Sequence, residues 1–147
     1  QLCKDLRGAG YKGPMMVPDG CVENAFIESA GPQNANGSVY ATFGGLPASQ
    51  LTGKGAEFYK AYKARYNAEP EVYAVYGYEC GRAALDAIRR AGKKDRAAIL
   101  AAMAATKDFD GALGKWAFDE NGDTTSKTMS GQMAKDGRWT FVEVLGN

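Results

Sequence analysis

Asp19 is the ionisable residue best placed to contact a small ligand. It follows a short apolar run, residues 14–17, that suits a buried parallel strand, and Gly20 follows it. Ligands of open α/β sheets collect at the carboxyl ends of parallel strands, where a carboxylate accepts strong hydrogen bonds from a cationic group. The alternative is an Asp-Gly turn, or an N-cap before residues 22–30, and neither of these needs a ligand.

Catalytic and metal chemistry have little support in the sequence. It contains no histidine, and this removes the commonest general base and the commonest zinc ligand. Cys3, Cys21 and Cys80 lack CxxC spacing. We therefore expect no catalytic residue, no metal site, no cofactor and no enzymatic activity.

The acidic segment at residues 119–123 begins like a calcium loop. The position that requires glycine holds Thr124, and the position that requires glutamate holds Ser130. A hairpin turn explains the segment better.

Charge and hydropathy exclude two further classes of protein. Eighteen basic and seventeen acidic residues give a net charge of +1, so nucleic-acid binding is not expected. No apolar run approaches the roughly 18 residues of a membrane span. The hydrophobic content of 45% is typical of a folded chain.

The first part of the chain alternates between helical and strand patterns. Leu2, Leu6 and Ala9 share one helical face, and residues 22–30 form a second amphipathic helix that ends at Gly31. Residues 37–43 alternate as a strand. This order predicts an open parallel sheet with helices on its faces.

Helical patterns dominate the second part. A Gly- and Pro-rich connection at residues 44–50 precedes helices around Phe58, around residues 72–88, and after Asp95, which can act as an N-cap. The segments 129–134 and 139–144 flank an Asp-Gly pair and predict a β-hairpin. We expect this terminal ribbon to have no sheet of its own to join.

Four motifs in fixed order resemble the periplasmic solute-binding proteins of the branched-chain amino acid ABC transporters, the type I periplasmic binding fold. They are LRGAGYKGPMMVPDG, ESAGPQNANGSVYAT, FYKAYKARYNAEPEVYAVYGYECGRAALDAIRRAG and FDGALGKWAFDENGDTTSKTMSGQMAKDGRW. The resemblance covers essentially the whole chain. It implies an α/β protein of two lobes, more than twice as long, with the ligand between lobes that close by hinge motion.

The resemblance also implies a division of this chain. Residues 1–43 would belong to lobe two, residues 44–112 to lobe one, and residues 113–147 to the return crossing and the C-terminal ribbon of lobe two. The front portion, with most of lobe one, would be absent. We therefore expect residues 1–147 to need that missing N-terminal half, or a second copy, to cover apolar surface.

The ligand contacts implied by the resemblance begin with Asp19, which would receive the ammonium group of an amino acid. Leucine and isoleucine binders carry glutamate there, and the missing methylene moves the charge back by roughly 1.5 Å. This leaves room for a different ligand or a bridging water. Tyr73 would flank the ligand side chain, with core or hinge packing as its alternative, and Gly20 and Tyr76 are weaker candidates.

These implications define the expected function. The protein would capture a branched-chain or similar aliphatic amino acid in the periplasm, after export, and deliver it to an ABC transporter permease. The alternatives are a ligand-sensing receptor or regulatory domain of the same fold, or a binder of an aromatic carboxylic acid or amide. In an oxidising location Cys3 and Cys21 could pair, with buried free thiols as the alternative.

Overall fold

The computed structural model describes residues 1–146, which divide into two compact units. Unit one comprises residues 1–46 together with those from Thr128 onward, and unit two comprises Pro47–Lys127. The units therefore change after residues 46 and 127, whereas the predicted lobes change after residues 43 and 112. The assignment of these parts to the lobes of a larger protein stays a prediction.

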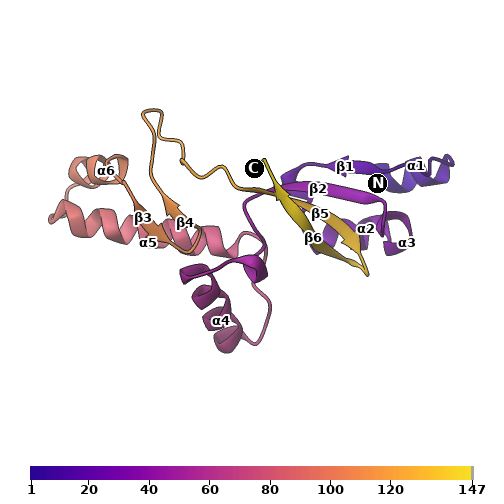
Figure 1. Ribbon diagram of the computed structural model, residues 1–147, viewed down its shortest axis with the longest axis horizontal. Helices are drawn as coiled ribbons and strands as arrows, with labels where there is room; N and C mark the ends of the chain where they lie inside the picture. The colour runs from indigo at the N-terminus through magenta and orange to yellow at the C-terminus, as the bar shows by residue number, and fades with distance from the viewer. Residues whose placement is uncertain (147) are drawn as a thin grey trace. The chain divides into compact units, whose positions relative to one another are not determined.

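Unit one is built on a four-stranded sheet with the strand order β1-β2-β5-β6 (Figure 1). The strands are β1 (Met15–Val17), β2 (Val39–Gly44), β5 (Met129–Lys135) and β6 (Arg138–Leu145). β1 and β2 run parallel, with Val17 opposite Ala41, as the sequence predicts. The β2–β5 and β5–β6 pairs are antiparallel, so the sheet is mixed. The α/β fold class is confirmed.

The C-terminal ribbon joins this sheet, and the expectation that it has no sheet to join was wrong. β5 pairs with β2, and Met129 lies opposite Gly44. The hairpin itself was predicted correctly, because Asp136 and Gly137 have φ angles of 51° and 76°, as a two-residue type I′ turn requires. A turn signal is local, whereas the partner strand lies far earlier in the sequence.

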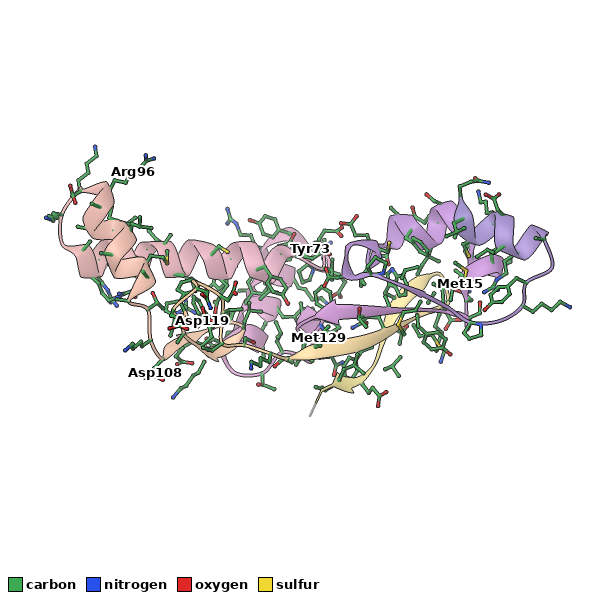
Figure 2. All side chains as sticks on the ribbon, turned by 90° about the horizontal axis from the view of Figure 1, so that it is seen from above. Met15, Tyr73, Arg96, Asp108, Asp119 and Met129 are labelled. Carbon is green, nitrogen blue, oxygen red and sulfur yellow. The ribbon has the colours of Figure 1, made fainter. Side chains whose placement is uncertain are left out.

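Short helices pack on one face of the sheet and form the core of unit one (Figure 2). They are α1 (Leu2–Gly8), α2 (Asn24–Ala30) and α3 (Pro32–Ala35). The short 3-10 helix η1 (Asp19–Cys21) follows β1 and has no buried residue. Ile27, Ala35, Val39 and Ala134 are fully buried together. Val39 and Ala41 face this core, while Tyr40 and Thr42 are only partly buried, as the alternating pattern predicts.

The buried face of α1 differs from the predicted one. Leu2 is 67% exposed, whereas Cys3 is buried among α2, α3 and the sheet. The helix has only seven residues. Its orientation is set by Arg7, which donates hydrogen bonds to the carbonyl oxygens of Tyr11 and Asn34, so the apolar pattern alone selected the wrong face.

All three cysteines are free thiols, so Cys3 and Cys21 do not form a disulfide in this structure. The Sγ atom of Cys3 lies 3.5 Å from the carbonyl oxygen of Asn34, inside the core of unit one. Cys80 is exposed.

Unit two consists of helices and one small hairpin (Figure 1). Its elements are η2 (Ala48–Gln50), α4 (Lys54–Tyr66), α5 (Ala74–Ala91), α6 (Arg96–Ala104), β3 (Phe109–Gly111) and β4 (Gly114–Trp116). Phe58, Val75 and Ala112 form its core. Within the described residues, no helix combines the length and the apolar character that crossing a membrane requires.

Two side chains fix the ends of the helices in unit two. The carboxylate of Asp95 accepts a hydrogen bond from the backbone N–H of Ala98 at 2.8 Å, so the predicted N-cap of α6 is confirmed. Arg90 pairs with Asp86 and donates to the hydroxyl of Thr106 at 2.8 Å. This arginine therefore joins α5 to the segment that follows α6.

Candidate functional site

Asp19 lies where the sequence predicts it, immediately beyond the carboxyl end of β1. Pro18 keeps the chain extended, with ψ at 169°, and Asp19 then begins the single turn of η1. The side chain is half-buried. Because β2 runs parallel to β1, both strands end at the edge of the sheet that carries this carboxylate.

The carboxylate of Asp19 is oriented by the backbone of the neighbouring strand. Its Oδ2 atom accepts a hydrogen bond from the N–H of Gly44, the last residue of β2, at 2.7 Å. A hydrogen bond to an ionised acceptor is stronger than a neutral one. The contact fixes the direction of the side chain.

The capping alternative for Asp19 has a clear structural outcome. The N-cap residue of η1 is Pro18, and that of α2 is Glu23. Neither makes a side-chain capping bond. Asp19 is thus a residue inside η1 and is the N-cap of neither helix.

Tyr73 occupies the N-cap position of α5 and is 40% exposed (Figure 2). Its ring centroid lies 6.4 Å from that of Tyr76, which is half-buried and packs against the core of unit two. Tyr76 therefore serves packing in this structure. Tyr73 presents much of its surface at the beginning of the helix.

Gly20 is exposed inside η1. A Cβ atom added there meets no other atom within 4 Å, and its φ angle is not positive. Neither steric crowding nor backbone conformation therefore requires glycine at this position, and its ligand role stays a prediction. Gly20 and Asp19 belong to unit one, and Tyr73 and Tyr76 belong to unit two, so the structure brings each pair together within its own unit.

Metal binding finds no support in the part of the chain that the structure describes, where no three potential ligands cluster. The calcium-like segment is a turn, as predicted. The Oδ1 atom of Asp119 accepts hydrogen bonds from the N–H groups of Asn121 and Asp123, both at 2.9 Å (Figure 2). Phe118 and Thr124 form the β-bridge that closes it.

Sequence reasoning missed Gly44, which is the hydrogen-bond partner of Asp19, and Ser130, which bonds to the next residue, Gly45. The hydroxyl of Ser130 donates to the carbonyl oxygen of Gly45 at 2.7 Å and accepts from the side-chain amide of Gln132 at 3.0 Å. Ser130 and Gln132 are both buried. The one available signal was the Gly44-Gly45 pair, which ends the strand where the chain leaves unit one.

A hollow of about 720 Å³ lies between α4 and α5. Its walls carry the rings of Phe58, Tyr62, Tyr66 and Tyr78, together with charged side chains such as Arg82. The guanidinium of Arg82 lies 5.9 Å from the ring of Tyr78 and 5.7 Å from that of Phe109.

Comparisons with known proteins give a consistent result. A family model described as periplasmic binding protein matches residues 1–138. The leucine-binding protein LivK of Thermotoga maritima is 30% identical with a TM-score of 0.87, and the match covers 97% of this chain and 40% of that one. LivJ of Streptococcus pneumoniae, solved with isoleucine, is 28% identical with a TM-score of 0.83, covering 98% and 40%.

A more distant match supports the fold alone. A solute-binding protein of R. palustris, solved with benzoate, is 21% identical with a TM-score of 0.75, and the match covers 97% of this chain and 39% of that one. The chain therefore spans about 40% of the length of the solved structures that it matches.

Proposed function

Because the chain belongs to the periplasmic binding protein family and has the α/β architecture of its type I fold, we propose that it acts in a non-catalytic solute-binding protein of an ABC importer. The proposed ligand is a small aliphatic amino acid, held between two lobes that close around it by hinge motion. The protein would be exported to the periplasm and would deliver its ligand to the transporter permease.

The position and orientation of the Asp19 carboxylate carry this proposal. The group stands beyond the carboxyl end of a parallel strand, is half-buried, and is held by the N–H of Gly44 at 2.7 Å. A carboxylate in this arrangement suits the ammonium group of an amino acid, because a charge-assisted hydrogen bond is strong where water is excluded. LivK is described as a leucine-binding protein and LivJ was solved with isoleucine, and both descriptions support the aliphatic class.

Tyr73 is the proposed contact for the ligand side chain. An exposed aromatic ring at a helix start offers a flat apolar wall, which selects for shape rather than for charge. Gly20 and Tyr76 are secondary candidates.

The lobes and their completion belong to the same proposal. Unit one would form part of lobe two, and unit two part of lobe one. On α5 the side chains of Tyr78, Leu85 and Ile88 are 44%, 69% and 48% exposed, and Tyr78 also lines the aromatic hollow. A preceding portion of the same protein would cover this surface, since the chain spans only about 40% of its structural relatives.

Titration calorimetry on the longest natural chain that contains these residues tests the proposal. We expect L-leucine, L-isoleucine or L-valine to bind, with benzoate as the arm for an aromatic acid. Asp19→Ala and Asp19→Asn should each lose about 2 to 5 kcal/mol, or roughly thirty- to several-thousand-fold in affinity. Asp5→Asn removes an exposed carboxylate from α1 and is the matched control. Unchanged affinity in both Asp19 variants would contradict the assignment.

A further inference from the structure

The outgoing crossing of the chain, at Gly44 and Gly45, is held by two side chains from distant segments. Gly44 is the last residue of β2 and Gly45 follows it, and the first segment of unit one ends at Leu46. Gly44 donates its N–H to Asp19 at 2.7 Å, and Gly45 accepts at its carbonyl oxygen from Ser130, also at 2.7 Å. One segment is therefore fixed through both its donor and its acceptor.

The crossing consists of two glycines, which have no side chains. Gly45 has a φ of 111°, a conformation that side chains rarely permit. A glycine pair has no side chain to pack, so its position depends on its backbone hydrogen bonds. Ser130 is fully buried and is held by Gln132, so it supplies a rigid attachment point.

Asp19 differs from Ser130 because it is also the proposed ligand group. We infer that Asp19 is a positioning residue for the outgoing crossing, so that the ligand and the crossing share one carboxylate. This inference rests on the proposed function for the ligand. An ammonium group that binds Asp19 partly neutralises the carboxylate charge that strengthens the hydrogen bond from Gly44. Ligand binding therefore alters the bond that holds the crossing.

The coupling is reciprocal. If ligand binding weakens the hydrogen bond between Asp19 and Gly44, then loss of that bond changes the affinity for the ligand by the same coupling free energy. Hinges consist of a few residues at the ends of elements, and Gly44 and Gly45 stand at the end of β2. Ligand binding would therefore directly change the hydrogen bonding of the segment through which the chain leaves unit one.

The same contact gives a physical reason for aspartate at this position. A glutamate would place its carboxylate roughly 1.5 Å farther along the side chain. The short side chain reaches Gly44 while its backbone remains in η1. The hydrogen bond between Asp19 and Gly44 of β2 thus gives a reason for aspartate, rather than glutamate, at this position.

NMR spectroscopy of the longest natural chain that contains these residues tests the inference. The amide proton of Gly44 should shift downfield as Asp19 ionises, because a charged acceptor polarises the N–H bond. In Asp19→Asn this titration should be lost, because the neutral side-chain oxygen still accepts from Gly44, and the Gly44 resonance should stay near its wild-type position at low pH. In Asp19→Ala both the titration and the native position should be lost.

The matched control is Ser130→Ala, which releases the neighbouring Gly45 and leaves the carboxylate in place. It should preserve the titration of Gly44. L-leucine should move the Gly44 amide proton upfield in the wild-type protein. A Gly44 resonance that does not follow Asp19, or a native resonance position in Asp19→Ala, overturns the inference.

The two proposals fail in different ways. If L-leucine and the other amino acids do not bind while Gly44 still follows Asp19, the positioning role is supported and the proposed function is overturned. If L-leucine binding depends on Asp19 but leaves Gly44 unmoved, the shared carboxylate is overturned and the proposed function stands.

Discussion

The carboxylate of Glu79 on α5 accepts a hydrogen bond from the indole N–H of Trp116 on β4 at 2.7 Å. Its other oxygen accepts from the backbone N–H of Ala112 at 2.8 Å, and Leu113 adds a longer contact at 3.4 Å. Glu79 is only 3% exposed. The β3–β4 hairpin, and with it the return of the chain toward unit one, is thus fixed on α5 by one buried carboxylate.

Removing this carboxylate should destabilise unit two. Glu79→Ala leaves at least two buried N–H donors without partners, which gives an expected loss of about 2 to 5 kcal/mol. Glu79→Gln keeps one acceptor and should lose about 1 to 2 kcal/mol. Urea unfolding followed by the fluorescence of Trp116, in a Trp139→Phe background, measures both. The exposed Glu120→Gln is the control, and equal stability of all variants would contradict the role of Glu79.

Gly111 is the neighbour that makes room for Glu79. A Cβ atom at this position would lie 1.6 Å from Oε1 of Glu79. Gly111→Ala should therefore cost about 1 to 3 kcal/mol. The same substitution in a Glu79→Ala background should cost less, because the clash is gone, and a double-mutant cycle measures that coupling.

Gly77→Ala is the matched control for this substitution. A Cβ atom at Gly77 meets nothing within 4 Å, and the residue lies inside α5. Helical alanine should raise the unfolding free energy by about 0.5 to 1 kcal/mol. A similar loss of stability in both glycine variants would show that backbone flexibility, rather than the space around Glu79, explains the effect.

Local signals in the sequence were reliable, and non-local contacts were not visible in it. The N-cap at Asp95 and the turn at Asp136 depend on neighbours within three residues, and both were predicted. The pairing of β5 with β2 joins segments almost ninety residues apart, and no periodicity encodes such a partner. The role of Glu79 could not be predicted for the same reason, because its hydrogen-bond donors follow more than thirty residues later.

The candidate site shows the same limit. Strand order and the Asp-Gly pair placed Asp19 at the edge of the sheet. Its hydrogen bond to Gly44 requires knowledge of how far β2 extends beyond β1. The apolar pattern of α1 predicted that Leu2 is buried. Cys3 is the buried residue instead, because the contacts of Arg7 set the orientation of the helix.

The Lys54–Asp110 ion pair predicts a pH dependence. The ammonium of Lys54 lies 2.5 Å from Oδ2 of Asp110, and this hydrogen bond lowers the pKa of that carboxyl below its ordinary value. A lowered pKa in the folded state stabilises it above about pH 4, and this contribution is lost as the pH falls through the folded pKa. Both side chains are substantially exposed, so the effect on stability should be small.

Lys54→Met should raise the pKa of Asp110 toward its ordinary value. Carboxyl chemical shifts measured by NMR through the acid range report this directly. The pKa of Asp86, which is held low by Arg90 and Arg89, is the internal reference and should not move. An unchanged Asp110 titration would show that Lys54 does not pair with it in solution.

The apolar face of α5 predicts the behaviour of residues 1–147 in isolation. Leu85 is 69% exposed, beside Ile88 and Tyr78. Such a surface should bind a hydrophobic dye and promote self-association, and Leu85→Gln should reduce both with a change of at most about 0.5 kcal/mol in stability. Ala83→Gln, at a buried site on the same helix, should destabilise the chain instead. Sedimentation and dye binding measure the surface, and a monomer with low dye binding would contradict it.

Tyr73 provides the last prediction, which concerns the aromatic wall of the proposed site. Its ring is 40% exposed at the N-cap of α5. If it contacts an aliphatic ligand side chain, Tyr73→Ala should reduce the affinity for L-leucine about tenfold, or about 1.4 kcal/mol, through lost apolar contact. Tyr73→Phe keeps the ring and should bind nearly as the wild type does. Tyr11→Ala is the control, because Tyr11 is also exposed but lies before β1, at the opposite end of the strand from Asp19. Calorimetry on the longest natural chain measures all three variants, and thermal unfolding separates lost binding from lost folding. An affinity that is unchanged in Tyr73→Ala, together with a lower melting temperature, would assign the ring to packing instead.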